Sequence, residues 1–208
     1  SFTYFIGLIV LRYEKLGLRL KGRWIFEGLS GAFSPGELVG ICGPNGSGKS
    51  SFLRCLASLL NPTTGEIFLE QKSLSLYTLE ELSLLRSYMR LETSCQWDLT
   101  LEEILQLYKR GSCHAQRTLL KEIGFEFPLQ KKFSSLSSGE RSLFLLGLAL
   151  GNNSLIILLD EMTAMLDEER SHHVMKILCK KAEMGKAIVL ILHDRLLAEK
   201  YCHRILKF

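Results

Sequence analysis

Short apolar runs alternate with amphipathic stretches along most of the chain, and glycine-rich turns separate them. The runs at residues 155–159 and 187–192 are long enough for buried strands and too short for helices. A similar run at residues 38–42 ends in a glycine-rich loop, and residues 66–69 alternate like a strand. Buried strands that alternate with amphipathic helices predict an α/β domain with a largely parallel sheet.

Apolar residues recur at helical spacing in several of the other segments. We predict a helix at residues 49–60, because the breaker Asn61-Pro62 follows it directly. The same spacing predicts helices at residues 141–150 and 168–183.

The middle of the chain has a different character. Strand signals fade between about residues 92 and 133, where residues 101–108 and 115–123 show helical spacing instead. The length of the chain suits one domain with its own core. We therefore expect a single domain at residues 1–208 with a helical subdomain at about residues 92–142.

The composition is that of an ordinary globular protein, with 47% apolar and 23% charged residues. No apolar run reaches the roughly 18 residues that a membrane-spanning helix needs. The run at residues 2–11 is interpreted as a buried strand, because no basic segment precedes it as in a signal peptide. The net charge of +4 is mild and the basic residues are scattered, which does not favour a nucleic-acid partner.

The six cysteines are widely spaced and form no C-x-x-C pair. Several of them stand inside apolar runs, where cysteine behaves as a small buried hydrophobic residue. We interpret them as reduced thiols without a metal site.

The clearest chemical signal matches the pattern G-x-x-x-x-G-K-[ST] between a predicted strand and a predicted helix. Glycines allow the backbone to wrap so closely that its N–H groups point at phosphate oxygens, and the following helix adds the positive end of its dipole. Lys49 can reach the β- and γ-phosphates, and the Ser50 hydroxyl can ligate Mg²⁺. The predicted ATP-binding residues are Gly43, Pro44, Asn45, Gly46, Ser47, Gly48, Lys49, Ser50 and Ser51.

A pair of carboxylates, Asp160 and Glu161, stands at the end of a predicted buried strand. Such a pair is often only part of a solvated loop, but beside a phosphate loop the first carboxylate suits Mg²⁺ and the second can polarise a water. His193 follows the next predicted strand and emerges at the same edge of the sheet, so we expect it to contact the γ-phosphate. His172 and His173 stand on an amphipathic helix and are expected to be exposed.

Three further motifs indicate a family. Residues 136–140, LSSGE, resemble the LSGGQ signature of ABC ATPases. As in that family, they stand upstream of the predicted strand that ends in Asp160 and Glu161. Residues 160–167, DEMTAMLD, resemble the family's DEPTSALD, and residues 192–194, LHD, look like its H-loop. With the phosphate loop, these motifs extend the resemblance over residues 16–208, so the chain resembles the ATP-binding subunit of an ABC transporter.

This resemblance implies a P-loop NTPase core of the ABC type with an N-terminal antiparallel β subdomain and a helical insertion subdomain. It also implies that two such domains pair head to tail, as a homodimer, with each ATP between one phosphate loop and the partner copy's signature. A helix expected to begin at Arg141 would aim its dipole at the γ-phosphate. The signature residues that would act on the other copy's ATP are Ser137, Ser138, Gly139 and Glu140.

The resemblance also implies roles for the remaining site residues and the partners. Glu161 would orient the attacking water, His193 would hold the γ-phosphate, and Lys49 would complete the catalytic set. Ser50 and Asp160 would hold Mg²⁺. The motif also contains the D-loop residue Asp167. The activity would be hydrolysis of ATP to ADP and phosphate, coupled to membrane-spanning permease subunits. Through them the chain would lie in the cytoplasm, peripheral on the inner face of the plasma (inner) membrane.

Two departures from the family pattern affect the expected site. Leu91 stands where the Q-loop glutamine belongs, and Glu92 beside it could ligate Mg²⁺ after a shift of one position. The position of the adenine-stacking aromatic is occupied by Leu20, with Tyr13 or Trp24 as substitutes. These changes leave open a binding-only subunit that works beside a better ATPase, although the retained acids and histidine favour hydrolysis.

Residues 97–104 and 192–202 look like the subfamily that imports metal chelates, namely siderophore, haem or vitamin B12 complexes. Residues 26–30 and the short chain instead resemble the small haem-export ATPase of cytochrome c maturation. A non-transport, soluble ABC ATPase of the iron–sulfur assembly type also stays open. Metal-chelate import is the favoured hypothesis.

Overall fold

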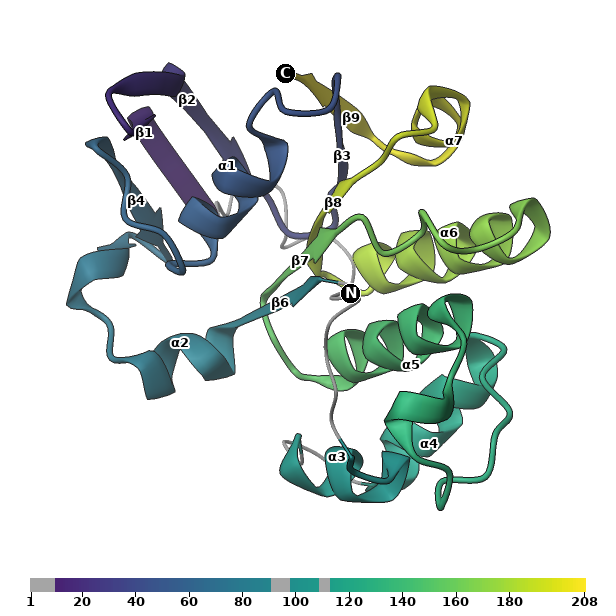
Figure 1. Ribbon diagram of the computed structural model, residues 1–208. Coiled ribbons are helices and arrows are strands. Elements are labelled where there is room, and N and C mark those ends of the chain that lie inside the picture. Colours follow the sequence, from purple (N-terminus) through teal and green to yellow (C-terminus); the bar gives the residue numbers. More distant parts are fainter. Residues whose placement is uncertain (1–9, 91–97, 109–112) are drawn as a thin grey trace.

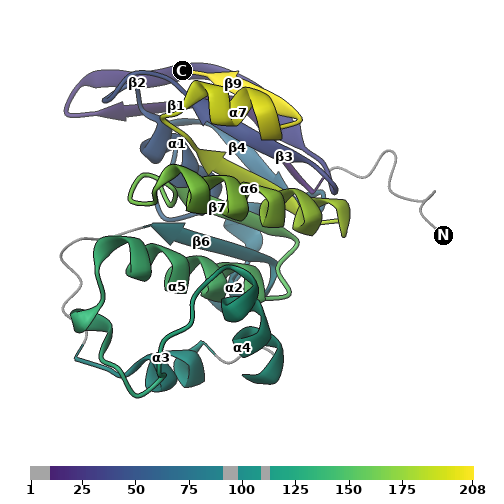
Figure 2. The same cartoon turned by 90° about the vertical axis from the view of Figure 1, so that its right-hand side faces the viewer.

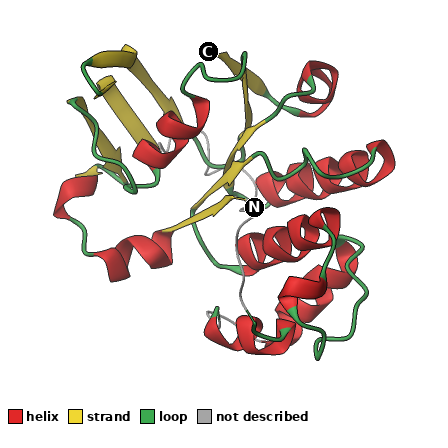
Figure 3. Ribbon diagram, in the orientation of Figure 1, coloured by secondary structure: helices red, strands yellow, loops and turns green. Residues whose placement is uncertain are grey.

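One antiparallel and one parallel β-sheet form the framework of the protein in this computed structural model, which describes residues 10–90, 98–108 and 113–208. Helices lie on both faces of the parallel sheet, and the antiparallel sheet stands to one side of it (Figures 1 and 3). The combination confirms the predicted α/β character of the chain.

The antiparallel sheet has the strand order β2-β1-β4-β5. A two-residue turn, Lys21-Gly22, joins β1 to β2, and both of its φ angles are positive, 47° and 81°. Such a turn matches the right-handed twist of its strands and closes a tight hairpin. The strands are β1 (Leu11–Leu20), β2 (Arg23–Phe33), β4 (Thr64–Leu69) and β5 (Lys72–Ser73).

The second sheet has the order β6-β7-β8-β3-β9, and its neighbouring strands are all parallel. Two of its interior strands, β7 and β8, are buried at every position, because helices cover both faces. Parallel strands place their carboxyl ends at one edge, so the segments that follow β3, β7 and β8 meet there. The strands are β3 (Leu38–Cys42), β6 (Arg86–Arg90), β7 (Ile156–Asp160), β8 (Ala187–Ile191) and β9 (Arg204–Lys207).

The two faces of the parallel sheet carry separate hydrophobic cores. On one face α1 packs between the two sheets, and on the other face α5, α6 and α7 lie side by side (Figures 1 and 2). The helices α3 and α4 extend the second core beyond the edge strand β6 (Figure 1). The α-helices are α1 (Lys49–Leu56), α2 (Leu79–Leu85), α3 (Leu101–Leu107), α4 (Cys113–Glu122), α5 (Ser138–Gly151), α6 (Glu168–Glu183) and α7 (Arg195–Tyr201).

The first helix is shorter than predicted. α1 ends at Leu56, although the sequence pattern predicted a helix as far as residue 60. Ser58 adopts a left-handed conformation, with φ 53°, and the N–H of Leu59 donates to the carbonyl of Arg54 at 2.9 Å. A left-handed residue just beyond the last turn ends an α-helix by satisfying its free carbonyls.

The predicted helical subdomain corresponds to α3, α4 and the start of α5, while the assignment of one domain to residues 1–208 stays a prediction. Within the ranges that the structure describes, no helix is long and apolar enough to cross a membrane. The apolar run at residues 2–11 lies mostly outside these ranges.

The side chains of four cysteines, Cys42, Cys55, Cys179 and Cys202, are described, and each is a free thiol. Burial raises the pKa of Cys55 to about 11 and that of Cys202 to about 12. These two side chains are therefore neutral thiols at physiological pH.

Aromatic packing fixes α1 against the antiparallel sheet. The ring of Phe52 is fully buried and lies 5.1 Å from the rings of both Tyr13 and Phe208. We expect Phe52→Ala to lower the free energy of unfolding by about 3–5 kcal/mol, since it leaves a cavity between the two sheets. Chemical denaturation measures the change. As a control, Leu76→Ala removes a side chain that is 67% exposed and should change stability by less than about 0.5 kcal/mol.

Candidate active site

The glycine-rich segment at residues 43–48 forms a loop between β3 and α1. Gly46 and Gly48 have φ angles of 79° and 101°, which glycine adopts without strain. A Cβ atom on Gly48 would lie 2.7 Å from a methyl carbon of Ile25, so the loop also needs glycine there for space. The backbone N–H groups that open α1 donate to no capping side chain, since the N-cap residue is Gly48.

Lys49 folds back into this loop. Its side chain is only 4% exposed, and its ammonium donates to the carbonyls of Gly43 and Pro44 at 2.8 and 2.7 Å. The carbonyls hold the charged group in the loop without neutralising it. The loop therefore has a buried positive charge at the place where the sequence predicts phosphates.

The buried carboxylate of Asp160 links β7 to the start of α1. The Ser50 hydroxyl donates to its Oδ1 atom at 2.9 Å, and the Tyr88 hydroxyl donates to its Oδ2 atom at 3.1 Å. Burial raises the pKa of Tyr88, and the charge of Asp160 raises it further, so the phenol is a neutral donor. Arg90 Nε lies 3.7 Å from the same Oδ2 atom.

Glu161 and His193 meet at the carboxyl edge of the sheet. His193 Nε2 lies 3.0 Å from Glu161 Oε1, and both side chains are about two-fifths exposed, at 41% and 42%. Glu161 has a φ angle of 58°, which costs energy in a residue other than glycine. This backbone conformation places the carboxylate of Glu161 beside His193, in the turn directly after Asp160.

One open cleft contains most of these groups. It has a volume of about 360 Å³ and lies over the start of α1. The structure thus brings together the predicted phosphate loop, the predicted water-activating acid and the predicted γ-phosphate contact. The residues that line it are Ile25, Asn45, Gly46, Gly48, Lys49, Ser50, Ser51, Glu161 and His193.

The signature segment is the N-terminus of α5. The expected start of this helix at Arg141 is wrong, because Ser137 caps it and the helix begins at Ser138. The Ser137 hydroxyl accepts from the backbone N–H of Glu140 at 3.3 Å, and the Glu140 carboxylate accepts from the N–H of Ser137 at 2.7 Å. This reciprocal capping box works with Glu or Gln in its last position, which explains why glutamate fits here.

The helix dipole therefore begins within the signature itself, and Gly139 is buried in the first turn. The four residues 137–140 are not among those that line the cleft over α1. Within one copy, the signature and the phosphate loop contribute to different surfaces.

The turn after Glu161 connects the cleft to α5. The Ser142 hydroxyl donates to the backbone carbonyl of Met162, and a Cβ atom on Gly139 would lie 3.0 Å from the carbonyl of Met165. Asp167, the predicted D-loop residue, ends this turn and caps α6 by accepting from the N–H of Arg170 at 2.8 Å.

One candidate for the adenine-stacking aromatic has another position than expected. Tyr13 cannot stack on adenine, because it is 4% exposed and packs in the core under the antiparallel sheet. Leu20 and Trp24 are exposed, and Trp24 precedes Ile25 of the cleft, so Trp24 stays a prediction as the adenine-stacking residue. The predicted metal ligand Glu92 lies outside the described residues.

One histidine prediction is also wrong. His172 is half-buried rather than exposed, since it shares a hydrogen bond of 3.0 Å with the hydroxyl of Tyr201 on α7. His173 is exposed, as predicted.

Sequence reasoning missed Tyr88 and Arg90. Both residues stand on β6, and Arg90 is the direct register partner of Asp160 on β7. The alternation of a strand could have indicated that residues 88 and 90 share a face. It could not indicate that β6 would pair with β7.

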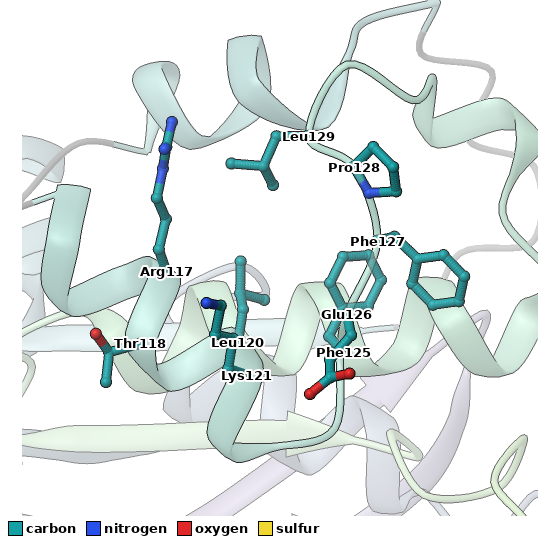
Figure 4. Close-up of a pocket in the computed structure, with 9 residues that line it drawn as sticks. All are labelled: Arg117, Thr118, Leu120, Lys121, Phe125, Glu126, Phe127, Pro128 and Leu129. Carbon is teal, nitrogen blue, oxygen red and sulfur yellow. The ribbon is translucent and has the colours of Figure 1, made fainter.

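A second hollow, of about 650 Å³, lies apart from these groups. It is formed by α4 and the segment that follows it, with Arg117 and Lys121 on the helix and an apolar wall of Phe125, Phe127 and Leu129 (Figure 4). It contains none of the phosphate-loop residues. The candidate active site is therefore the smaller cleft over α1.

Comparisons with known proteins show the family. A family model described as ABC transporter matches residues 26–164. The hemin import ATP-binding protein HmuV of Methylobacillus flagellatus is 33% identical over 205 residues, which cover 91% of this chain and 76% of the relative. The lipoprotein-releasing system ATP-binding protein LolD of Aquifex aeolicus is 34% identical over 210 residues, which cover 95% of this chain and 93% of the relative.

Solved structures show the same fold. A dimeric bacterial ABC transporter cassette aligns with a TM-score of 0.81 at 25% identity, covering 95% of this chain and 94% of that one. The same cassette has also been solved as a dimer in a post-hydrolysis state with ADP and phosphate. An ATP-binding subunit of an ABC transporter aligns with a TM-score of 0.84 at 22% identity, covering 96% and 85% of the two chains. The predicted fold class is confirmed.

The capping box at the start of α5 generates a stability prediction. Ser137→Ala removes the side-chain acceptor for the N–H of Glu140 and should lower the free energy of unfolding by about 1 kcal/mol. Ser137→Asp should keep the stability of the parent protein, because aspartate is an equally good N-cap. Thermal denaturation of the three proteins compares them, and equal losses for both variants would contradict a capping role.

Proposed function

Because this chain belongs to the ABC transporter family and is an ATPase that energises transport, we propose that the cleft over α1 is its ATP site and that it powers import of a metal chelate such as haem. The observation that carries the proposal is the hydrogen bond of 2.9 Å between Ser50 and Asp160. It joins the phosphate loop to the strand that ends in the acid pair.

In the proposed site, phosphate oxygens replace the carbonyls that hold the ammonium of Lys49. Those contacts, at 2.8 and 2.7 Å, are neutral acceptors, and an anionic phosphate is a stronger one. The free N–H groups at the start of α1 add donors on the same side. The loop is thus organised for a triphosphate before one arrives.

The residues present fit Mg²⁺. Ser50 and Asp160 offer a hydroxyl and a buried carboxylate within 2.9 Å of each other, and hard oxygen donors are what Mg²⁺ prefers. We propose that these two side chains hold it, directly or through water. When bound, the ion neutralises charge on the phosphate oxygens.

We propose Glu161 as the residue that orients the attacking water and His193 as the γ-phosphate contact. Both line the cleft that contains Lys49, and they contact each other at 3.0 Å. When ATP binds, the imidazole of His193 contacts the γ-phosphate as well as Glu161. The carboxylate of Glu161 is then free to accept a hydrogen bond from water.

A second copy completes the proposed site. Ser138 and Gly139 open α5, yet the residues 137–140 do not line the cleft of their own copy. The dipole at the start of this helix, and the N–H groups of Ser138 and Gly139 that the capping box does not use, suit an anion. Head-to-tail pairing, supported by the dimeric cassette with the same fold, would present them to the partner's triphosphate. We propose a homodimer that sits against permease subunits at the inner face of the membrane.

Haem or another metal chelate is the proposed cargo, because HmuV relatives are similar over most of the chain. LolD is equally similar, which makes lipoprotein release the second candidate. Haem export and iron–sulfur assembly are weaker alternatives that rest on sequence resemblance alone. The proposed site binds ATP and not the cargo, so it does not discriminate among these cargoes.

The proposed roles of Lys49 and Glu161 predict two different defects. Lys49→Ala should abolish both nucleotide binding and turnover, because the only side-chain charge in the loop is removed. Glu161→Gln should reduce turnover at least 100-fold, a loss of general-base catalysis, while ATP binding persists and a stable ATP-bound dimer accumulates. Phosphate release and size-exclusion chromatography measure these outcomes. Turnover at the parent rate in Glu161→Gln would show that the base is another residue.

The proposed cargo predicts which molecule stimulates the assembled transporter. The chain should co-purify in detergent with a membrane-spanning partner. In proteoliposomes, ATPase activity should rise when haem is supplied, and Glu161→Gln should abolish the response. Stimulation by a lipoprotein and not by haem would instead favour the second candidate. Co-purification with a soluble scaffold would contradict transport.

A further inference from the structure

The second oxygen of Asp160 has its own environment, separate from Ser50. Its Oδ2 atom accepts from the Tyr88 hydroxyl at 3.1 Å and lies 3.7 Å from Arg90 Nε. Asp160 itself is 1% exposed, while the Arg90 side chain is 47% exposed. The buried oxygen Oδ2 of Asp160 therefore faces both a hydroxyl donor, from Tyr88, and a half-exposed cation, Arg90.

Strand register produces this arrangement. β6 pairs with β7 in parallel, with Tyr88 opposite Leu158 and Arg90 opposite Asp160. Residues two apart on a strand point to the same face, so both polar groups of β6 approach the carboxylate from one side. Ser50 approaches its other oxygen from α1.

We propose that Tyr88 and Arg90 are positioning residues that set the affinity of the Ser50–Asp160 pair for the divalent cation, in opposite directions. Tyr88 strengthens cation binding and Arg90 weakens it. The proposal rests on the proposed magnesium site and adds two residues that no motif of the family resemblance includes.

The effect of Tyr88 follows from orientation. A carboxylate turns about its bond to Cβ unless both oxygens have partners. The phenol holds Oδ2, so Oδ1 stays directed at the Ser50 hydroxyl, and the lone pairs of the serine oxygen stay free for a metal. Without the phenolic hydroxyl the carboxylate can rotate away from this arrangement.

The effect of Arg90 follows from charge. A guanidinium 3.7 Å from Oδ2 stabilises the buried carboxylate when no cation is present. The guanidinium then repels a divalent cation that binds near the same carboxylate. Because the arginine is half exposed and its contact is long, this opposition is modest and the side chain can move away.

The test determines the dissociation constant of Mn²⁺, which serves as a probe for Mg²⁺. Electron paramagnetic resonance measures the concentration of free Mn²⁺, with a non-hydrolysable ATP analogue present at saturation. Tyr88→Phe keeps the ring and its packing, and should raise the Mn²⁺ dissociation constant about threefold to tenfold. Arg90→Gln should lower it about twofold to fivefold. The double variant should fall between the two.

Two matched controls separate these effects from general ones. Tyr77→Phe removes a hydroxyl that donates to the carbonyl of Leu69 at 2.8 Å, and Arg12→Gln removes an exposed ion pair with Glu14. Both should leave the Mn²⁺ dissociation constant unchanged. Circular dichroism establishes that each variant is folded.

The outcomes distinguish this inference from the proposed site. Loss of analogue-dependent Mn²⁺ binding in Ser50→Ala, together with opposite shifts in the two β6 variants, supports both. If Ser50→Ala loses binding but neither β6 variant shifts it, the inference is wrong and the site stands. If Arg90→Gln weakens binding, the opposing role of Arg90 is wrong. If Ser50→Ala binds Mn²⁺ like the parent, the proposed metal site itself fails.

Discussion

The hydrogen bond from Ser50 to the buried carboxylate of Asp160 connects two segments that are far apart in the chain. Ser50 belongs to the first turn of α1, which follows the phosphate loop, and Asp160 is the last residue of β7. Every chemical group proposed for hydrolysis is placed relative to this contact. It forms because β3, β8 and β7 are neighbours in a parallel sheet and end at the same edge. Shifting β7 by one register position would turn the carboxylate to the opposite face and leave a buried charge without a partner.

The segment that contains Asp160 and Glu161 also connects the cleft to α5, the helix that begins in the signature. The carbonyl of Met162 accepts from Ser142 of α5, and the turn that contains it starts at the strained residue Glu161. A partner's triphosphate bound at the start of α5 would therefore act on a helix that contacts the turn beside Glu161, the proposed water-activating acid of this copy. Packed contacts and hydrogen bonds of this kind can carry energetic coupling between two sites. Two relatives of similar identity differ in the cargo that their names give, hemin for one and lipoprotein for the other.

The phosphate loop and the acid pair could be predicted from sequence because each is a local pattern with a strict requirement. Glycines at 46 and 48 allow positive φ angles, and a lysine at 49 follows them into the helix. Asp160 and His193 could be placed at one edge because each follows a short apolar run, and such runs form neighbouring parallel strands. The four family motifs in order made the fold class predictable as well.

Tertiary structure decided the features that depend on which surfaces meet. The chain contained two aromatic residues near the expected adenine position, and only packing against Phe52 shows that Tyr13 is buried. The start of α5 at Ser138, in contrast, follows from a capping box within residues 137–140, a local pattern that the sequence could have indicated. The environment of Asp160 depends on β6 pairing with β7, a contact between residues 88–90 and 158–160. Sequence determines which local patterns are possible, because their interactions span a few residues. Only the folded chain determines which distant groups share one carboxylate, because sheet order is set by the burial of the whole domain.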